Sequence, residues 1–408
     1  MSRSVLLTSA FLVACGARTN LDQPVDGGPS DSGAQAHPAC GTWPMVGHDP
    51  ARTSRSPFTG PRSAHVRWSF ALGQPAAVAP VIASDGTIYA ADVGAVHAVS
   101  ASGEEQWKVG IQIPEELAIG CDGSLYVLAY GADPSSSGER LLALSPVDGT
   151  SKWEYAHLGG GATGVINSPV PFGADIYVRT FQLDTIRTDG TLEWQVPRYI
   201  GTSNLAVDSA GTAYACSNPI VDAAPPTAAG RTLSATSANG STQWSDPLPN
   251  GVGGIVLLDD GVLYVGNGSY EPDSCRLSAF DLSGAWLWEI SLMACVRGPM
   301  AVAPDGDLYA ATSSGLLAVT PSTHGQRLAW TPTGPWQFMS PPVIDAEGFV
   351  YVMTQPLSPQ AVLAAIRPDD TVAFTFTWNT GSIALVPPAL GDGVLYLVGA
   401  SGLQAIGP

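Results

Sequence analysis

The stretch Asp85-Gly86-Thr87-Ile88-Tyr89 is the first copy of a phrase that decides the fold. The phrase is a small or acidic residue, a glycine, two further residues and a tyrosine, and it returns about every 44 residues, a period expected of repeated four-stranded units. Its eight tyrosines are Tyr89, Tyr126, Tyr177, Tyr214, Tyr264, Tyr309, Tyr351 and Tyr396. Because Asp and Gly favour tight turns, each copy predicts a hairpin that leads into a strand through the tyrosine.

A second phrase follows most of these tyrosines and ends in tryptophan, as in Ala98 to Trp107. It places a small residue and a polar turn with glycine before the indole. The later copies end at Trp153, Trp194, Trp244, Trp288 and Trp330, and the seventh becomes the aromatic cluster Phe374, Phe376 and Trp378. We expect each indole to lie between neighbouring repeats and to donate its N–H to a backbone carbonyl there.

The last repeat lacks a fourth strand after Tyr396, and the missing strand is expected at the other end of the chain. Val66 to Phe70 has the character of an outer strand and carries Trp68, an otherwise unassigned indole of the same kind. Pairing this strand with the last repeat would close the ring and remove both free sheet edges. The sequence therefore predicts an all-β fold, an eight-bladed β-propeller of four-stranded antiparallel blades whose ring is closed by an N-terminal strand.

The N-terminal segment predicts export and anchoring. Residues 1–14 have the charged start and short apolar run of a signal peptide, and Leu12-Val13-Ala14-Cys15 resembles the bacterial lipobox, whose cysteine is lipidated and becomes the mature N-terminus. An ordinary signal peptide that contains a cysteine is the alternative. Residues 15–41 are rich in Gly, Pro, Ser and Asp and predict a flexible tether, which leaves 42–408 for the propeller.

Cysteine usage agrees with export. Beyond Cys15 the cysteines are Cys40, Cys121, Cys216, Cys275 and Cys295. Their number is odd, so at least one thiol is free or bonded elsewhere, and Cys275 with Cys295 is the best candidate disulfide because the two bracket two strands of one repeat.

Charge restricts the partners. The chain has 35 acidic and 17 basic residues and a formal net charge of −18. So few cations cannot neutralise many phosphates, and we expect no nucleic acid partner. The only membrane contact that we expect is the lipid anchor.

The repeats, together with the upstream phrase 43–50 and the later Ser56-Pro57, resemble the PQQ-like (pyrrolo-quinoline quinone) β-propeller repeat family over residues 42–408, in the form of a bacterial lipoprotein member. That family contains quinone-dependent alcohol dehydrogenases and the lipoprotein propeller of the outer-membrane β-barrel assembly machinery. The resemblance implies the fold, and it leaves the function open because propellers carry unrelated activities.

No catalytic, metal or cofactor site is predicted. The six histidines have no metal-ligand spacing, and acidic clusters such as Asp305-Gly306-Asp307 occupy hairpin turns where Asp and Gly are favoured for backbone reasons. The family's quinone enzymes would show a vicinal cysteine pair, which is absent from this sequence. We therefore expect no enzyme and no cofactor, with an oxidoreductase that holds a quinone or another cofactor over the central channel as the alternative.

The function predicted is that of a monomeric, lipid-anchored scaffold of the outer membrane or cell surface, which binds a protein or envelope component on one propeller face. Residues just before the inner strands should share one channel mouth, and they are polar, although solvated loops would be polar too. These residues are Glu115, Glu116, Asn167, Ser168, Asn204, Arg297, Trp336, Gln337 and Ser340. Arg297 is the expected contact for an anion, and the Glu115-Glu116 pair opposes a tricarboxylate such as the quinone.

Overall fold

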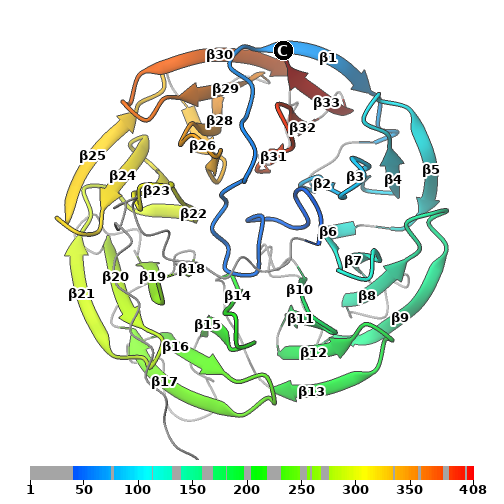
Figure 1. The fold of residues 1–408 in the computed structure, drawn as a ribbon, viewed down its shortest axis with the longest axis horizontal. Coiled ribbons are helices and arrows are strands. Elements are labelled where there is room, and N and C mark those ends of the chain that lie inside the picture. The colour runs from blue at the N-terminus through cyan, green and yellow to red at the C-terminus, as the bar shows by residue number, and fades with distance from the viewer. Residues whose placement is uncertain are drawn as a thin grey trace, which may run out of the picture. The chain divides into compact units, whose positions relative to one another are not determined.

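A computed structural model describes fifteen stretches of the chain, all of them within the unit Gln35–Pro408. The described residues are 40–74, 78–112, 114–130, 139–158, 169–180, 182–196, 204–217, 231–248, 255–257, 260–267, 275–333, 336–356, 360–379, 386–399 and 402–408. Their regular structure consists of strands, which form eight antiparallel sheets arranged as a ring (Figure 1). No helix that could span a bilayer occurs in this part of the chain.

The first four blades follow one another along the chain, each with its innermost strand first. Blade 1 contains β2 (Val81–Ile82), β3 (Ile88–Asp92), β4 (Ala95–Val99) and β5 (Glu105–Gly110). Blade 2 contains β6 (Pro114–Ile119), β7 (Leu125–Tyr130), β8 (Glu139–Leu144) and β9 (Ser151–Leu158). Blade 3 contains β10 (Val170–Phe172), β11 (Asp175–Arg179), β12 (Leu183–Arg187) and β13 (Leu192–Val196). Blade 4 contains β14 (Ala206–Val207), β15 (Ala213–Ser217), β16 (Arg231–Thr236) and β17 (Thr242–Leu248).

The next three blades repeat this order. Blade 5 contains β18 (Ile255–Leu257), β19 (Val262–Asn267), β20 (Arg276–Asp281) and β21 (Trp286–Ser291). Blade 6 contains β22 (Val296–Val302), β23 (Leu308–Thr312), β24 (Leu316–Thr320) and β25 (Gly325–Trp330). Blade 7 contains β26 (Trp336–Met339), β27 (Val343–Ile344), β28 (Val350–Pro356), β29 (Gln360–Ile366) and β30 (Val372–Asn379). Its inner strand is in two pieces because Pro341 and Pro342 have no N–H to donate to β28.

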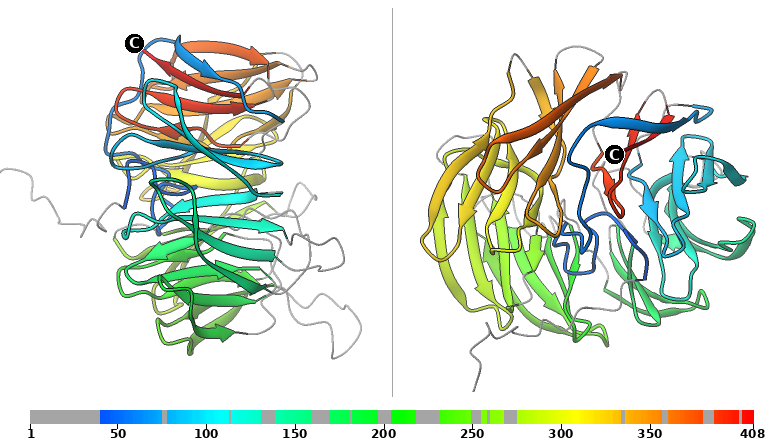
Figure 2. Two further views of the ribbon diagram at one scale, coloured as in Figure 1. Left: turned by 90° about the vertical axis from the view of Figure 1, so that its right-hand side faces the viewer. Right: turned by 45° about the horizontal axis from the view of Figure 1, so that its top comes forward.

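The eighth blade joins the two ends of the ring and confirms the predicted closure. It contains β31 (Ala389–Leu390), β32 (Leu395–Gly399), β33 (Gly402–Gly407) and, on the outside, β1 (His65–Phe70). The antiparallel register runs from His65 opposite Gly407 to Phe70 opposite Leu403. In Figure 2 the blue strand β1 lies beside the red strand β33. The fold is thus the predicted eight-bladed propeller.

Each tyrosine of the repeated phrase lies buried in the second strand of its blade. In blade 4 the Tyr214 hydroxyl donates to Asp208 at 2.9 Å, and in blade 7 Tyr351 reaches Asp345 at 3.1 Å. In these two blades the turn carboxylate accepts the hydrogen bond that a buried phenol needs, whereas in blade 3 Tyr177 donates to the Gly211 carbonyl of the next blade.

The outer-strand tryptophans lie across the seams between blades. Five indole N–H groups donate to a carbonyl in the turn between the third and fourth strands of the next blade. The pairs are Trp68 to Ala101 at 2.9 Å, Trp107 to Pro146 at 2.8 Å, Trp153 to Thr188 at 2.8 Å, Trp194 to Ala238 at 2.7 Å, and Trp244 to Leu282 at 2.9 Å. Trp288 packs on His324 with the ring centroids 4.8 Å apart. Trp330, at the end of β25, is partly buried and packs against the apolar cluster between blades 6 and 7.

Two disulfides reinforce this unit. Cys275 is bonded to Cys295, across the open end of the β20–β21 hairpin. Cys40 is bonded to Cys121, in the turn between β6 and β7, so the last residues of the predicted tether are attached to blade 2. Cys216 is buried in β15. The predicted signal peptide, Cys15 and residues 16–39 lie outside the described residues.

Candidate functional site

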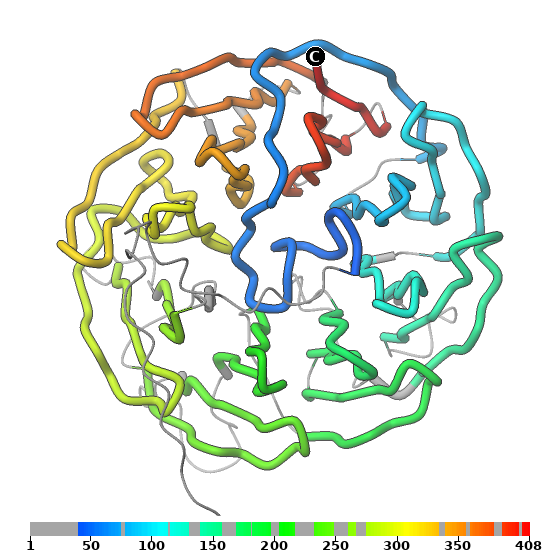
Figure 3. The backbone as a smooth tube through the Cα atoms, in the orientation of Figure 1, coloured from blue at the N-terminus to red at the C-terminus, as the bar shows by residue number. Residues whose placement is uncertain are grey.

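The segment 43–60, which we call the strap, crosses the centre of the ring on the side at which the inner strands end (Figure 3). It exchanges backbone hydrogen bonds with the inner-strand ends or the turns beyond them in six blades. The donors and acceptors are Trp43 N to Ile82 O, Ile119 N to Pro44 O, Val207 N to Pro50 O, Val302 N to Thr53 O, Ile344 N to Ser54 O, and Gly393 N to Thr59 O, all between 2.7 and 3.0 Å. We call this side of the ring the strap face, and the side on which the inner strands begin the start face.

Arg52 is the buried cation of the strap. It is 2% exposed, and its Nε donates to Leu205 O at 2.9 Å while Nη1 donates to Val46 O. Burial lowers the pKa of Arg52 to about 10, and the negative charges of Glu116 and Asp49 oppose that shift. An arginine stays protonated at such a value, so the channel contains a buried positive charge.

Carboxyl groups of blade 2 gather toward the start face. Glu116 on β6 and Glu139 on β8 are 8% and 7% exposed, and the Oε2 atom of each has no hydrogen-bond partner in the structure. Burial raises the pKa of each carboxyl to about 8, with Glu115 adding to both shifts and Arg52 opposing that of Glu116. Burial also raises the pKa of Glu115. Near neutral pH this group therefore binds protons that exposed glutamates would have released.

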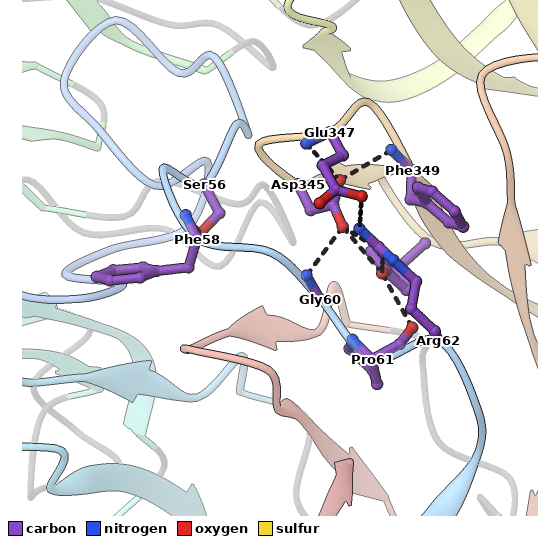
Figure 4. Close-up of polar contacts among 9 residues, drawn as sticks. Ser56, Phe58, Gly60, Pro61, Arg62, Asp345, Glu347 and Phe349 are labelled. Atoms are coloured by element: carbon purple, nitrogen blue, oxygen red, sulfur yellow. Dashed lines mark hydrogen bonds and ion pairs between the residues drawn. The ribbon is translucent and has the colours of Figure 1, made fainter. Parts of the chain in front are cut away.

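The strap is fixed to blade 7 just before β1 begins (Figure 4). Arg62 Nη1 lies 2.6 Å from Asp345 Oδ2 and donates to the Tyr351 hydroxyl at 2.8 Å, while Nη2 lies 2.6 Å from Glu347. The guanidinium also covers the Phe349 ring at 3.6 Å from its centroid. The Asp345 side chain is fully buried, so this pair is shielded from solvent on one side.

The backbone of Gly60 also contacts the buried Asp345 side chain of blade 7. Its N–H donates to Asp345 Oδ2 at 2.8 Å, and a Cβ on this residue would lie 2.3 Å from the Tyr351 hydroxyl. Only glycine allows the strap to approach blade 7 this closely. These contacts hold the chain at the end of the strap against blade 7.

The predicted mouth residues that the structure describes differ in their burial. Glu115 and Glu116 come together with Glu139, whereas Asn204 is buried before β14. Ser340 is fully buried, and its Oγ accepts a hydrogen bond from Met353 N at 3.0 Å. This bond replaces a backbone hydrogen bond between the strands where the inner strand of blade 7 is interrupted.

The other predicted mouth residues are Arg297, Trp336, Gln337, Asn167 and Ser168. Arg297 is exposed on β22 at the start face. Trp336 and Gln337 lie on β26, with side chains outside the description, and Asn167 and Ser168 lie outside the described residues.

Three important residues were missed from the sequence: Arg52, Arg62 and Glu139. In a chain with 17 basic residues, the three arginines between residue 42 and the first strand, Arg52, Arg55 and Arg62, are a signal that could have been followed. Glu139 had no such signal, because its burial follows only from the packing of blade 2. Among the described residues no group of three or more acidic, His or Cys side chains could hold a metal ion.

The ring of eight PQQ-like blades, closed by an N-terminal strand and crossed by a strap, defines the class of the protein. A family model described as outer membrane protein assembly factor BamB matches residues 59–289, which is more than half of the chain. The chain belongs to this family. No curated protein matches the sequence.

Solved structures share the fold at low identity. BamB from Moraxella catarrhalis superposes with a TM-score of 0.63 at 15% identity, over 84% of this chain and 99% of that one. Quinohemoprotein alcohol dehydrogenase from Comamonas testosteroni gives a TM-score of 0.61 at 14% identity, over 89% and 80%. The computationally designed Ika8 protein gives 0.62 at 7% identity, over 84% and 100%. At these identities the likeness shows the fold alone.

Proposed function

We propose that this protein is a non-catalytic scaffold of the bacterial cell envelope that binds a protein on its start face. One observation carries the proposal: the chain's own strap occupies the mouth on the strap face and is bonded to six blades. A partner that uses the channel region must therefore approach from the start face. Membership of a family described as an assembly factor supports a protein partner.

The oxidoreductase alternative fits the residues less well. The quinone is a tricarboxylate, and the start face of blade 2 holds Glu115, Glu116 and Glu139 instead of a set of cations. Arg52 is already engaged by two carbonyls on the strap side. Calorimetric titration with the quinone and calcium tests this directly, and submicromolar stoichiometric binding would restore the enzyme alternative.

Site-specific photo-cross-linking tests the face that is used. We expect p-benzoyl-phenylalanine in place of the exposed Arg297 to cross-link a partner protein in cell envelopes. Val147 is the matched control, because it is 84% exposed and lies in the β8–β9 turn at the strap face. Adducts from position 147 with none from position 297 would overturn the proposed face.

Lipid anchoring through Cys15, after removal of residues 1–14, belongs to the same proposal, as does location at the outer membrane or cell surface. The lipobox resemblance supports the anchor, and the family description supports the location. We also propose that the protein is monomeric, since both free ends of its ring are paired by β1 and β33.

A further inference from the structure

The outer strand of blade 5 has two consecutive exposed apolar side chains before its seam tryptophan, where blades 1 to 4 have at least one polar residue. In blades 1 to 4 the two residues before the seam tryptophan are Glu105-Gln106, Ser151-Lys152, Leu192-Glu193 and Thr242-Gln243. In blade 5 they are Trp286 and Leu287, which are 62% and 44% exposed. Four repeats of the same chain thus show that the fold does not need large apolar residues at both positions.

Two further apolar side chains extend this surface toward blade 6. Met293, just beyond β21, is 55% exposed, and Leu328 on β25 is 41% exposed. Gln326 holds the two strands together, since it accepts Met293 N at 3.1 Å and donates to Ser291 O at 2.7 Å. We call Trp286, Leu287, Met293 and Leu328 together the rim patch; they lie on or just beyond β21 and on β25, which are neighbouring outer strands in Figure 1.

The backbone of β21 is open on one side. Within the described part of the chain β21 is the last strand of its sheet and pairs with β20 alone. Exposed edges are usually protected by charge or proline. The one charged residue of β21, Glu289, contacts the neighbouring strand β20 of the same sheet. It accepts a hydrogen bond from the Ser278 hydroxyl at 2.9 Å and lies 3.6 Å from Arg276.

The same hairpin is clamped covalently. The Cys275–Cys295 disulfide joins the residue before β20 to a residue beyond β21, and Leu292 N donates to Cys275 O at 2.8 Å beside it. A clamped strand loses little conformational freedom when a second strand adds to it, which favours binding.

The net charge of the protein limits which partner could pair with the open edge of β21. A second copy of the protein would bring another net charge of −18, which opposes close pairing of two chains. A strand with apolar residues at alternate positions and lysine or arginine between them would fit both the edge and the charge. We propose that the rim patch docks an extended segment of a different protein, which adds as a strand to β21. This surface is separate from the start face.

A peptide of alternating valine and lysine, eight residues long, acetylated and amidated at its ends, is the probe. We expect the full chain to bind it in fluorescence anisotropy and the β21 amides to gain protection from hydrogen exchange. Leu287→Lys should weaken binding at least tenfold. Leu192→Lys, at an equally exposed leucine on the outer strand of blade 3, should change it less than twofold.

A peptide with threonine in place of valine separates strand addition from simple charge attraction. Equal binding of the two peptides, equal loss in the two variants, unprotected β21 amides or no binding at all would overturn the proposal. A wild-type dimer in sedimentation that Leu287→Lys dissociates would also overturn it, by making a second copy the occupant. The cross-linking from position 297 is independent of this variant, so the two proposals fail separately.

Discussion

At the scale of the residue, five of the eight seams between blades place an indole ring over a turn glycine of the next blade. Trp107 covers Gly149, where an added Cβ would lie 2.6 Å from the ring. Blades 6 and 7 lack the turn glycine, and His324 and Asp370 adopt positive φ angles of 57° and 63° in its place. Asp370 then accepts Arg327 of blade 6 at 2.6 Å, so an ion pair contributes to that seam.

Gly149→Ala should destabilise the protein more than Gly173→Ala. Both glycines have positive φ, so each alanine costs about 1–2 kcal/mol in backbone strain. A Cβ on Gly173 has nothing within 4 Å, whereas on Gly149 it displaces Trp107 and adds about 1–3 kcal/mol. Urea unfolding measures the difference, and equal losses would show that the indole contact contributes nothing.

The buried Glu139 carboxyl should cause the unfolding free energy of the protein to fall as the pH rises. Burial raises the pKa of its carboxyl to about 8, above the unfolded value of 4.5, so the folded state binds more protons between these values. Unfolding free energy therefore falls with pH across this window. Glu139→Gln should flatten the decline in melting temperature from pH 6 to 9. The exposed Glu104→Gln is the control, and an unchanged slope in Glu139→Gln would contradict the assignment.

At the scale of the element, β1 and the strap act as one closing segment. The strap contacts six inner-strand ends or adjacent turns, and β1 then covers β33. Arg62 lies between them and is tied to Asp345. Loss of this segment would leave unpaired backbone groups at the inner ends and at one outer edge.

A soluble form that starts at residue 71 should aggregate and unfold at a lower temperature than one that starts at residue 40. The shorter form exposes the β33 edge, which is paired in the longer form from His65 to Phe70. Light scattering and thermal unfolding check both properties. Identical melting of two monomeric forms would show that closure by β1 is dispensable.

At the scale of the whole molecule, the Cys40–Cys121 disulfide fixes where the chain enters the propeller. Cys121 lies in the β6–β7 turn at the strap face, so the disulfide holds Cys40 at that face.

Cys15→Ser should move the protein from the membrane fraction to the soluble fraction. The substitution removes the thiol that would carry the lipid, and no helix in the described part of the chain could span the bilayer in its place. Fractionation followed by mass spectrometry of the mature N-terminus measures the outcome. A wild-type N-terminus at any residue other than Cys15 would contradict the proposed anchor.

The sequence by itself determined the propeller, its eight blades and its closure by Val66 to Phe70. The blades follow from signals within each repeat, because Asp-Gly turns, short apolar strands and a seam tryptophan act on neighbours in the chain or in the next copy. The closure follows from the fourth strand that the last repeat lacks. The disulfide between Cys275 and Cys295 could also be predicted from the sequence, since it joins two residues of one repeat that are 20 positions apart.

Only the tertiary structure decided which mouth the strap occupies and which carboxylates become buried. Arg62 and Asp345 are 283 positions apart, and nothing in either local sequence indicates the other. The same holds for Arg52, whose acceptor Leu205 lies 153 residues away. Such contacts exist only when the ring brings eight inner strands to one axis, so burial and charge at the axis depend on closure and not on any single repeat.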